Sequence, residues 1–312
     1  MRSLSVAKGE IEMNAKRKKA FFNTDNFWGY LFVSPLLILM LIFSVGPIFF
    51  AFYMSLTDWQ LSGAGSFIGL ENFKELFADE ATWKELKNSL IYTVFKVPIG
   101  VAISLILAYF LNQKIPFRGL FRVIYFLPSI TMTVAIGLVW RYLFNSQYGI
   151  VNAILAVFGI QGPYWMADPK WFFPAIILVA IWQGIGYDMV ILLAGLQNVP
   201  GMYYEAAKME GASSFQCFRK ITVPLITPSL FFVIIMEFMN SLKVFDLIYI
   251  FINSSFGPIE NAARTMVYGI YQKAFVHSRM GYASAEAVIL FVIILAVTLV
   301  QFWGERKWVH YD

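Results

Sequence analysis

Long apolar stretches separated by short polar segments run through most of this chain. No Asp, Glu, Lys or Arg occurs in residues 26–57, 123–140 or 287–304. A helix of about 20 apolar residues can cross the hydrocarbon core of a bilayer. The pattern therefore predicts an all-α polytopic membrane protein with six transmembrane helices. We place these helices at residues 28–54, 88–111, 120–144, 172–196, 225–252 and 285–303.

The overall composition excludes an ordinary soluble domain. Of the 312 residues, 59% are hydrophobic and only 14% are charged, whereas about a quarter of a typical globular chain is charged. The first apolar stretch is longer than a signal-peptide core and no small-residue cleavage pattern follows it, so we expect it to be retained. The single cysteine, Cys217, allows no intrachain disulfide.

The distribution of Lys and Arg indicates the orientation in the membrane. With the N-terminus inside, the inner segments hold 14 of the 24 basic residues, the outer loops hold 7, and 3 lie within predicted helices. The positive-inside rule then favours both termini in the cytoplasm. This predicts a cytoplasmic N-terminal segment (1–25), a transmembrane domain (26–304) and a cytoplasmic tail (305–312). The basic residues suit contact with anionic lipid and form no single patch typical of nucleic-acid binding.

A polar, helix-forming loop at residues 199–224 interrupts the apolar sequence on the cytoplasmic side. Pro200 suits the start of a helix, and Gly211 suits a left-handed residue at its end. Ser213 with Gln216 forms a capping-box pattern for a second helix, which should end before Pro224. Such a helix–turn–helix could dock into a groove of a partner protein, or it could be an amphipathic connector at the membrane surface.

The motifs of this loop resemble those of a known family. The loop contains Glu205-Ala206-Ala207, then Gly211, then Ile221-x-Val223-Pro224. This order is similar to the Glu-Ala-Ala loop of the permease subunits of binding-protein-dependent ABC importers. The surrounding chain resembles the maltose-type and glycerol-phosphate-type permeases, which carry motifs similar to residues 125–128, 194–197, 245–249 and 281–283 here. Two positions depart from that pattern, since Glu210 and Val223 stand where the family usually has Asp and Leu.

The resemblance implies a type I ABC importer permease fold and a set of partners. It implies that the loop couples to an ATPase through Tyr204, Glu205, Ala206, Ala207, Glu210, Gly211 and Ala212. The expected partners are a second, homologous permease subunit, a cytoplasmic ATPase dimer, an extracytoplasmic solute-binding protein and a carbohydrate substrate. The chain has no G-x-x-x-x-G-K-[ST] phosphate loop, so we expect it to bind no cofactor, with ATP and Mg held by the ATPase. Transport would follow alternating access across a bacterial inner membrane.

Polar side chains within the predicted helices are candidates for substrate contact. Glu237, Asn240 and Ser241 share one face of the fifth predicted helix, and Glu237 lies about 20 Å from its inner end. The fourth predicted helix offers Gln183 and Tyr187, one turn apart, and the adjacent Asp188. Intramembrane charges usually face the bundle interior or a wet cavity. Hydrogen bonding between helices is the alternative explanation for the three residues of the fifth predicted helix.

Two further intramembrane charge patterns suggest structural roles. Lys243 and Asp246 are three residues apart and could pair with each other. Lys96 lies about two turns inside the second predicted helix, where its side chain could reach outward to the membrane surface.

Two other functional classes stay open from the sequence. An ABC permease for glycerol phosphate or an acidic saccharide would be supported by a cavity with net positive charge, to which Lys96 and Lys243 could contribute. A polytopic enzyme acting on a lipid-linked sugar would need reactive groups clustered at one membrane face. The acidic residues are scattered, and the two histidines, His277 and His310, are far apart. The Cys and His spacing predicts no metal site.

Overall fold

A computed structural model describes residues 25–63, 65–252 and 258–309 of the chain. The described residues form helices joined by loops, with two isolated β-bridges, Thr57–Phe67 and Gln60–Gly63, and no named strand among them. The chain divides into two compact units, residues 1–54 and 55–312, which we describe separately. The predicted N-terminal segment lies outside the described residues except for Asp25, as do His310 and the rest of the tail after Val309.

The described part of the first unit is one long apolar helical stretch. It consists of α2 (Asp25–Met40), a π-helical turn η1 (Leu41–Val45) and α3 (Gly46–Ser55). Residues Phe27–Ser55 are long and apolar enough to cross a membrane, as predicted for residues 28–54. The side chains of the η1 turn are all unburied.

Three further helices are long and apolar enough to cross a membrane without a break: α5 (Glu80–Asn112), α9 (Pro169–Gln197) and α17 (Met280–Trp308). They match the predicted helices at 88–111, 172–196 and 285–303. Each begins earlier than predicted, because residues before the apolar window, such as residues 80–87 of α5, also adopt helix. Side-chain caps define two of these starts, since Asp79 accepts a hydrogen bond from the Ala81 N–H and Asp168 accepts one from the Lys170 N–H.

The predicted helix at 120–144 is broken into two. Helices α6 (Arg118–Ile130) and α7 (Thr133–Leu143) meet at an angle of 99°. Pro128 lies two residues before the end of α6. The break itself follows Ile130, where the backbone of Thr131 turns extended, with φ of −81° and ψ of 142°.

The predicted helix at 225–252 also bends and divides. The segment Ser214–Leu225 meets Thr227–Ile252 at 69°. The first part contains α11 (Ser214–Cys217), a π-helical turn η2 (Phe218–Thr222) and α12 (Val223–Leu225), and the second contains α13 (Thr227–Leu242) and α14 (Asp246–Ile252). With each bent pair counted as one span, the described residues contain six spans, as predicted.

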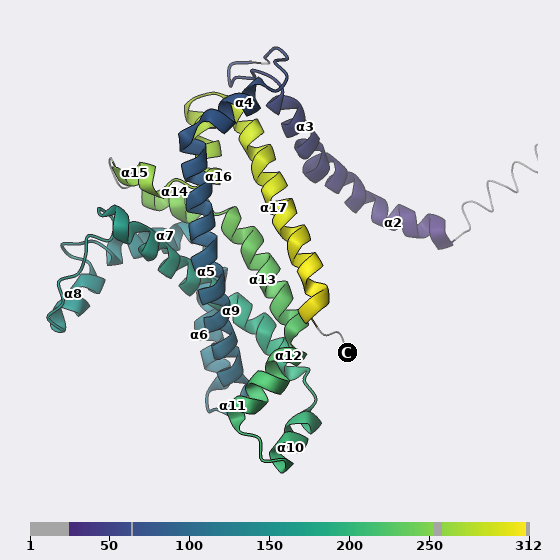
Figure 1. The fold of residues 1–312 in the computed structure, drawn as a ribbon, viewed down its shortest axis with the longest axis vertical. Helices are drawn as coiled ribbons and strands as arrows, with labels where there is room; N and C mark the ends of the chain where they lie inside the picture. The colour runs from purple at the N-terminus through teal and green to yellow at the C-terminus, as the bar shows by residue number, and fades with distance from the viewer. Residues whose placement is uncertain (1–24, 64, 253–257, 310–312) are drawn as a thin grey trace, which may run out of the picture. The chain divides into compact units, whose positions relative to one another are not determined.

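Short helices connect these spans. They are α4 (Glu71–Ala78), α8 (Ile150–Val157), α10 (Gly201–Met209), α15 (Pro258–Ala263), α16 (Met266–Tyr271) and a third π-helical turn, η3 (Gln272–Val276). Within the second unit, α10 and α11 lie at the end opposite α4 and α16 (Figure 1).

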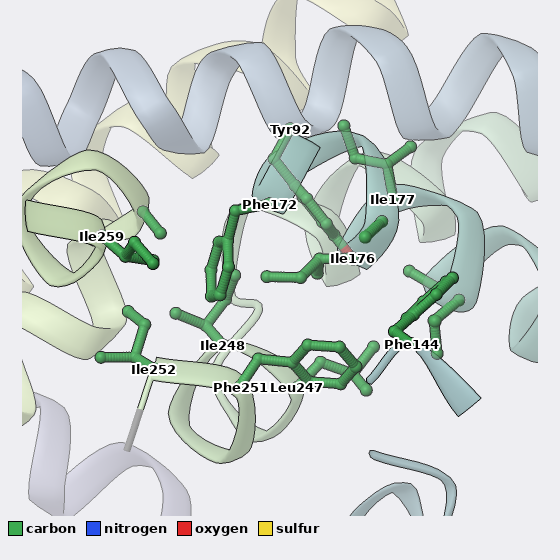
Figure 2. Close-up of a cluster of buried hydrophobic side chains, with 14 of the residues drawn as sticks. Tyr92, Phe144, Phe172, Ile176, Ile177, Leu247, Ile248, Phe251, Ile252 and Ile259 are labelled. Carbon is green, nitrogen blue, oxygen red and sulfur yellow. The ribbon is translucent and has the colours of Figure 1, made fainter. Parts of the chain in front are cut away.

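Two buried apolar clusters hold the second unit together around α9. One cluster joins α5, α7, α9, α14, α15 and α16, and its aromatic centre includes Phe172 and Phe251 with ring centroids 6.4 Å apart (Figure 2). The other joins the C-terminal halves of α5 and α9 to Ile226 and α13, and it contains Val97, Met189 and Val233. Burial of this apolar surface fixes the relative positions of the helices that carry polar side chains between the clusters.

Helices α6 and α9 approach each other closely at Gly186. A Cβ atom at this position would meet the Tyr125 carbonyl oxygen and would lie 2.7 Å from the Phe126 Cα. Both contacts are with backbone atoms, so no side-chain rotation can relieve them. A glycine is therefore required for α9 to pack against α6 in this arrangement.

Candidate functional site

A polar cavity of about 470 Å³ lies within the second unit, lined by residues from α5, α6, α7, α9, α13 and α14. Its wall carries amide, hydroxyl and charged groups together with a few apolar side chains. The lining residues are Tyr92, Lys96, Ser129, Thr133, Ala180, Gln183, Gly184, Tyr187, Glu237, Asn240, Lys243, Val244, Phe245, Asp246 and Leu247. Such a set of donors and acceptors suits a ligand with several hydroxyl or amide groups.

Four of the six predicted substrate residues line this cavity. Gln183 and Tyr187 reach it from α9, and Glu237 and Asn240 reach it from α13. Residues three or four apart share one helix face, so each pair presents its side chains to the same space. The Gln183 amide also donates to the Thr133 hydroxyl across a 3.0 Å hydrogen bond, which ties α9 to the start of α7.

The other two predicted substrate residues lie outside the cavity lining. Ser241 is 2% exposed, and its hydroxyl oxygen is buried without a hydrogen-bond partner among the described residues. It lies about 100° around the helix from Asn240. Asp188 is also buried, at 4% exposed, and it lies close enough to Lys96 and Glu237 to interact electrostatically with both.

Lys96 does not reach the membrane surface as predicted. It is buried, and its ammonium group forms an ion pair with the Glu237 carboxylate. Because α5 begins at Glu80 and ends at Asn112, Lys96 lies at the middle of the helix, about 24 Å from either end. A lysine side chain cannot span that distance, so the charge is satisfied inside the bundle. Lys96 and Glu237 both face the cavity.

Lys243 and Asp246 do not pair with each other either, and the described residues contain no ion pair between them. Helix α13 ends at Leu242 and α14 begins at Asp246. The break between them removes the helical spacing on which the predicted pairing depends. Both side chains line the cavity instead.

Several cavity residues were not identified from the sequence. Ser129 and Thr133 flank the break between α6 and α7, and Tyr92 belongs to α5. Ser129 and Thr133 could have been found from the sequence, because they belong to a group of polar residues that directly follows Pro128 within an apolar stretch. Tyr92 carries no such signal, because a single tyrosine in an apolar helix is commonly a core residue.

The loop at residues 199–224 has most of the predicted local structure. Helix α10 begins after Pro200, and Gly211 adopts a left-handed conformation with φ of 77°. The Ser213 N–H donates to the Gln216 side chain at 2.7 Å, and the Gln216 N–H donates to the Ser213 hydroxyl at 3.3 Å. The capping box is thereby confirmed. The second helix differs from expectation in two ways, because it contains the π-helical turn η2 and because it continues past Pro224 to Leu225.

Side-chain contacts tie the two parts of this loop together and join the loop to α5. The Tyr204 and Thr222 hydroxyls are 2.9 Å apart and hydrogen-bonded. Phe218 packs edge-on against Tyr109 of α5, with ring centroids 4.9 Å apart. The same loop exposes four large apolar side chains, namely Met202, Tyr203, Met209 and Phe215. Exposed apolar groups on a polar loop are typical of a surface that contacts another protein.

A second buried charge cluster lies near the start of α5 and was not predicted from the sequence. The Lys273 ammonium is 2.8 Å from a Glu85 oxygen, 2.9 Å from a Glu286 oxygen and 3.1 Å from the Thr82 hydroxyl. Burial alone would lower the pKa of Lys273, but the Glu286 and Glu85 carboxylates outweigh it and raise that pKa above its usual value. The cluster connects η3 to α5 and α17.

Comparison with known proteins places these features in a family. A sequence model described as "Binding-protein-dependent transport system inner membrane component" matches residues 100–310. The probable ABC transporter permease protein YesP of Bacillus subtilis is 38% identical over 304 residues, covering 96% of this chain and 97% of YesP. The lactose transport system permease protein LacF of Rhizobium radiobacter is 33% identical and covers 89% and 94% of the two chains.

A solved structure shares the fold. A chain from the crystal structure of a bacterial alginate ABC transporter, in complex with alginate pentasaccharide-bound periplasmic protein, has a TM-score of 0.79 and 24% sequence identity. The alignment covers 90% of this chain and 95% of that chain. The predicted type I importer permease fold is thereby confirmed, and the chain is a multi-pass membrane component of a transporter. On these sequence matches, the chain belongs to the family of binding-protein-dependent transport system inner membrane components.

Proposed function

We propose that this chain is one of two transmembrane subunits of an ATP-driven importer that moves a sugar or oligosaccharide across a bacterial inner membrane by alternating access. The polar cavity carries this proposal, because its amide and hydroxyl groups suit a polyhydroxylated ligand. Relatives that support it are named as permeases for lactose, for starch degradation products and for arabinooligosaccharides.

The substrate contacts in this proposal are Gln183, Tyr187, Glu237 and Asn240. Asp188 and Ser241 would hold these residues in position, since both are buried next to the residues that line the cavity. A second, homologous permease subunit would complete the pathway, and an extracytoplasmic solute-binding protein would deliver the saccharide. Alternating access requires that the bound partners favour one arrangement of the helices over the other.

Energy would come from a cytoplasmic ATPase dimer that binds ATP and Mg and contacts the loop at residues 199–224. Helix α10 would be the coupling element, with Tyr204, Glu205, Ala206 and Ala207 on it and Glu210, Gly211 and Ala212 at its end. The exposed side chains of Met202, Met209 and Phe215 supply apolar contact area around these residues. The Tyr204–Thr222 hydrogen bond would pass force from α10 to the segment that leads into α13.

Disruption of the coupling loop should remove the ATPase from the purified complex. Glu205→Lys reverses a charge at the proposed interface. Gly211→Pro cannot adopt the φ of 77° found at that position. We expect each variant to recover roughly tenfold less ATPase on affinity purification of this chain, as for a central interface residue. The control is Gln147→Lys, which introduces a lysine at an exposed residue of another loop. Undiminished ATPase recovery in both loop variants would contradict the proposed coupling role.

Removal of a cavity amide should impair transport without loss of assembly. Asn240→Leu or Gln183→Leu deletes one hydrogen-bonding group from the wall. We expect uptake of the carried saccharide at low concentration to fall about five- to tenfold, since one hydrogen bond contributes about 1 kcal/mol. Thr298→Val is the matched control, because within the described residues its hydroxyl bonds only to the Ile294 carbonyl of its own helix. Equal uptake in the control and both cavity variants would argue against this cavity as the substrate site.

A further inference from the structure

The charged groups that line the cavity balance in number. Lys96 and Lys243 are basic, and Glu237 and Asp246 are acidic, so the wall carries no net formal charge. Asp188 adds a further acidic group behind the wall. The positive cavity that would favour an acidic solute is therefore not formed by the residues of this chain that the structure describes.

Of the four charged groups in the cavity wall, Lys96 and Glu237 are buried, and they form an ion pair with each other. Lys96 is 7% exposed and Glu237 is 6% exposed. Charge interactions are strongest where water is excluded. In the described residues, Lys96 forms its ion pair with Glu237 alone, and Asp188 interacts electrostatically with both members.

A glycine leaves this pair open to the cavity. A Cβ atom at Gly184 would lie 3.8 Å from the Lys96 ammonium and 4.0 Å from a Glu237 carboxylate oxygen. With no side chain at position 184, a ligand group in the cavity can approach the pair directly. A neutral hydroxyl can accept a hydrogen bond from the ammonium or donate one to the carboxylate, because both groups have unused capacity.

An anionic group in the same position meets a different environment. The attraction of Lys96 is cancelled by Glu237, whose carboxylate repels a negative charge. We infer that Glu237 is a specificity-determining residue, which neutralises Lys96 and thereby restricts the cavity to uncharged saccharides. This inference rests on the proposed function and names the class of substrate.

The electrostatic potential of the cavity can be measured with charged thiol reagents. Cys217 is the only cysteine of the chain and is buried, so Cys217→Ser provides a background without native thiols. In this background, Asn240→Cys places a reporter thiol at an exposed position of the cavity wall. The probes are sulfonatoethyl and trimethylammonioethyl methanethiosulfonate, which carry opposite charges. The readout is the ratio of their labelling rates in the purified full complex.

Three variants form a cycle around the ion pair. Glu237→Gln should raise the anion-to-cation rate ratio about tenfold, because it leaves the Lys96 charge uncompensated. Lys96→Met should shift the ratio in the opposite direction by a similar factor. The double variant should return to within about twofold of the parent, since it removes one charge of each sign. If Glu237→Gln does not assemble, the opposite shift in Lys96→Met still tests the inference.

A reporter outside the cavity provides the control. Gln147→Cys, in an exposed loop, should show the same rate ratio in all backgrounds. Unchanged ratios at the Asn240 reporter in both single variants would overturn the inference. The rate ratio does not depend on which saccharide is carried. Failure of the inference is therefore distinct from failure of the proposed function, which would appear in the uptake experiment.

Discussion

Replacement of Lys273 by methionine is expected to lower the free energy of unfolding by about 3–5 kcal/mol. Lys273 is the cation shared by Glu85 and Glu286, whose side chains are 1% and 0% exposed. Without it, two buried carboxylates face each other with no compensating charge, and each also has one oxygen without a hydrogen-bond partner among the described residues. The measurement is thermal unfolding of the purified protein in detergent, at neutral pH.

The segment between α16 and α17, which contains Lys273, also contains a matched control for this prediction. Arg279 binds Glu75 through two hydrogen bonds, one of which is 2.7 Å long, but both side chains are about half exposed. Exposed ion pairs contribute about 1 kcal/mol or less, so Arg279→Met should lower the melting temperature far less than Lys273→Met. Equal losses in the two variants would show that burial does not determine the contribution of the Lys273 cluster.

Addition of a single methyl group at Gly186 should also destabilise the protein, by about 3 kcal/mol. The new Cβ would overlap the backbone of α6 at Tyr125 and Phe126, so α6 and α9 must separate. Overpacking of this kind typically costs about 1–3 kcal/mol, and a rigid backbone contact lies at the upper end of that range. We expect Gly186→Ala to reduce the yield of folded protein on size-exclusion chromatography and to lower its melting temperature.

Gly184→Ala is the control within the same helix. Its Cβ would have no neighbour closer than 3.8 Å, which is an ordinary contact distance. Alanine also favours helix over glycine by about 1 kcal/mol. Gly184→Ala should therefore be neutral or stabilising, and a loss as large as that of Gly186→Ala would contradict the steric explanation.

Features that depend on nearby residues could be predicted from the sequence. The left-handed Gly211 and the Ser213–Gln216 capping box follow from residues at most three positions apart, and both are present. The apolar spans followed from continuous hydrophobic stretches. Their starts were placed too late where polar residues extend the helix, as at Glu80 of α5. That error made Lys96 seem close to the membrane surface.

Features that depend on distant residues could not be predicted. Lys96 pairs with Glu237, 141 positions later, and Lys273 pairs with Glu85, 188 positions earlier. A helical face is visible in the sequence, but the neighbour that it meets is not. The face of α13 therefore indicated Glu237 and Asn240 as cavity residues, whereas the cation beside Glu237 required the packing of α13 against α5.

The bend at Ile226 gives α13 the geometry of a lever. Ile226 is 1% exposed and packs against the buried cluster that contains Val97, Met189 and Val233, so the short arm from Ser214 to Leu225 and the long arm through the cavity meet at a buried residue that can act as a pivot. Eleven residues separate Ile226 from Glu237, a distance of about 16 Å along a helix. A tilt of roughly 10° about this pivot carries Glu237 about 3 Å. A displacement of that size away from α5 would break the Lys96–Glu237 ion pair, and it would link the angle of this bend to the charge pairing in the cavity.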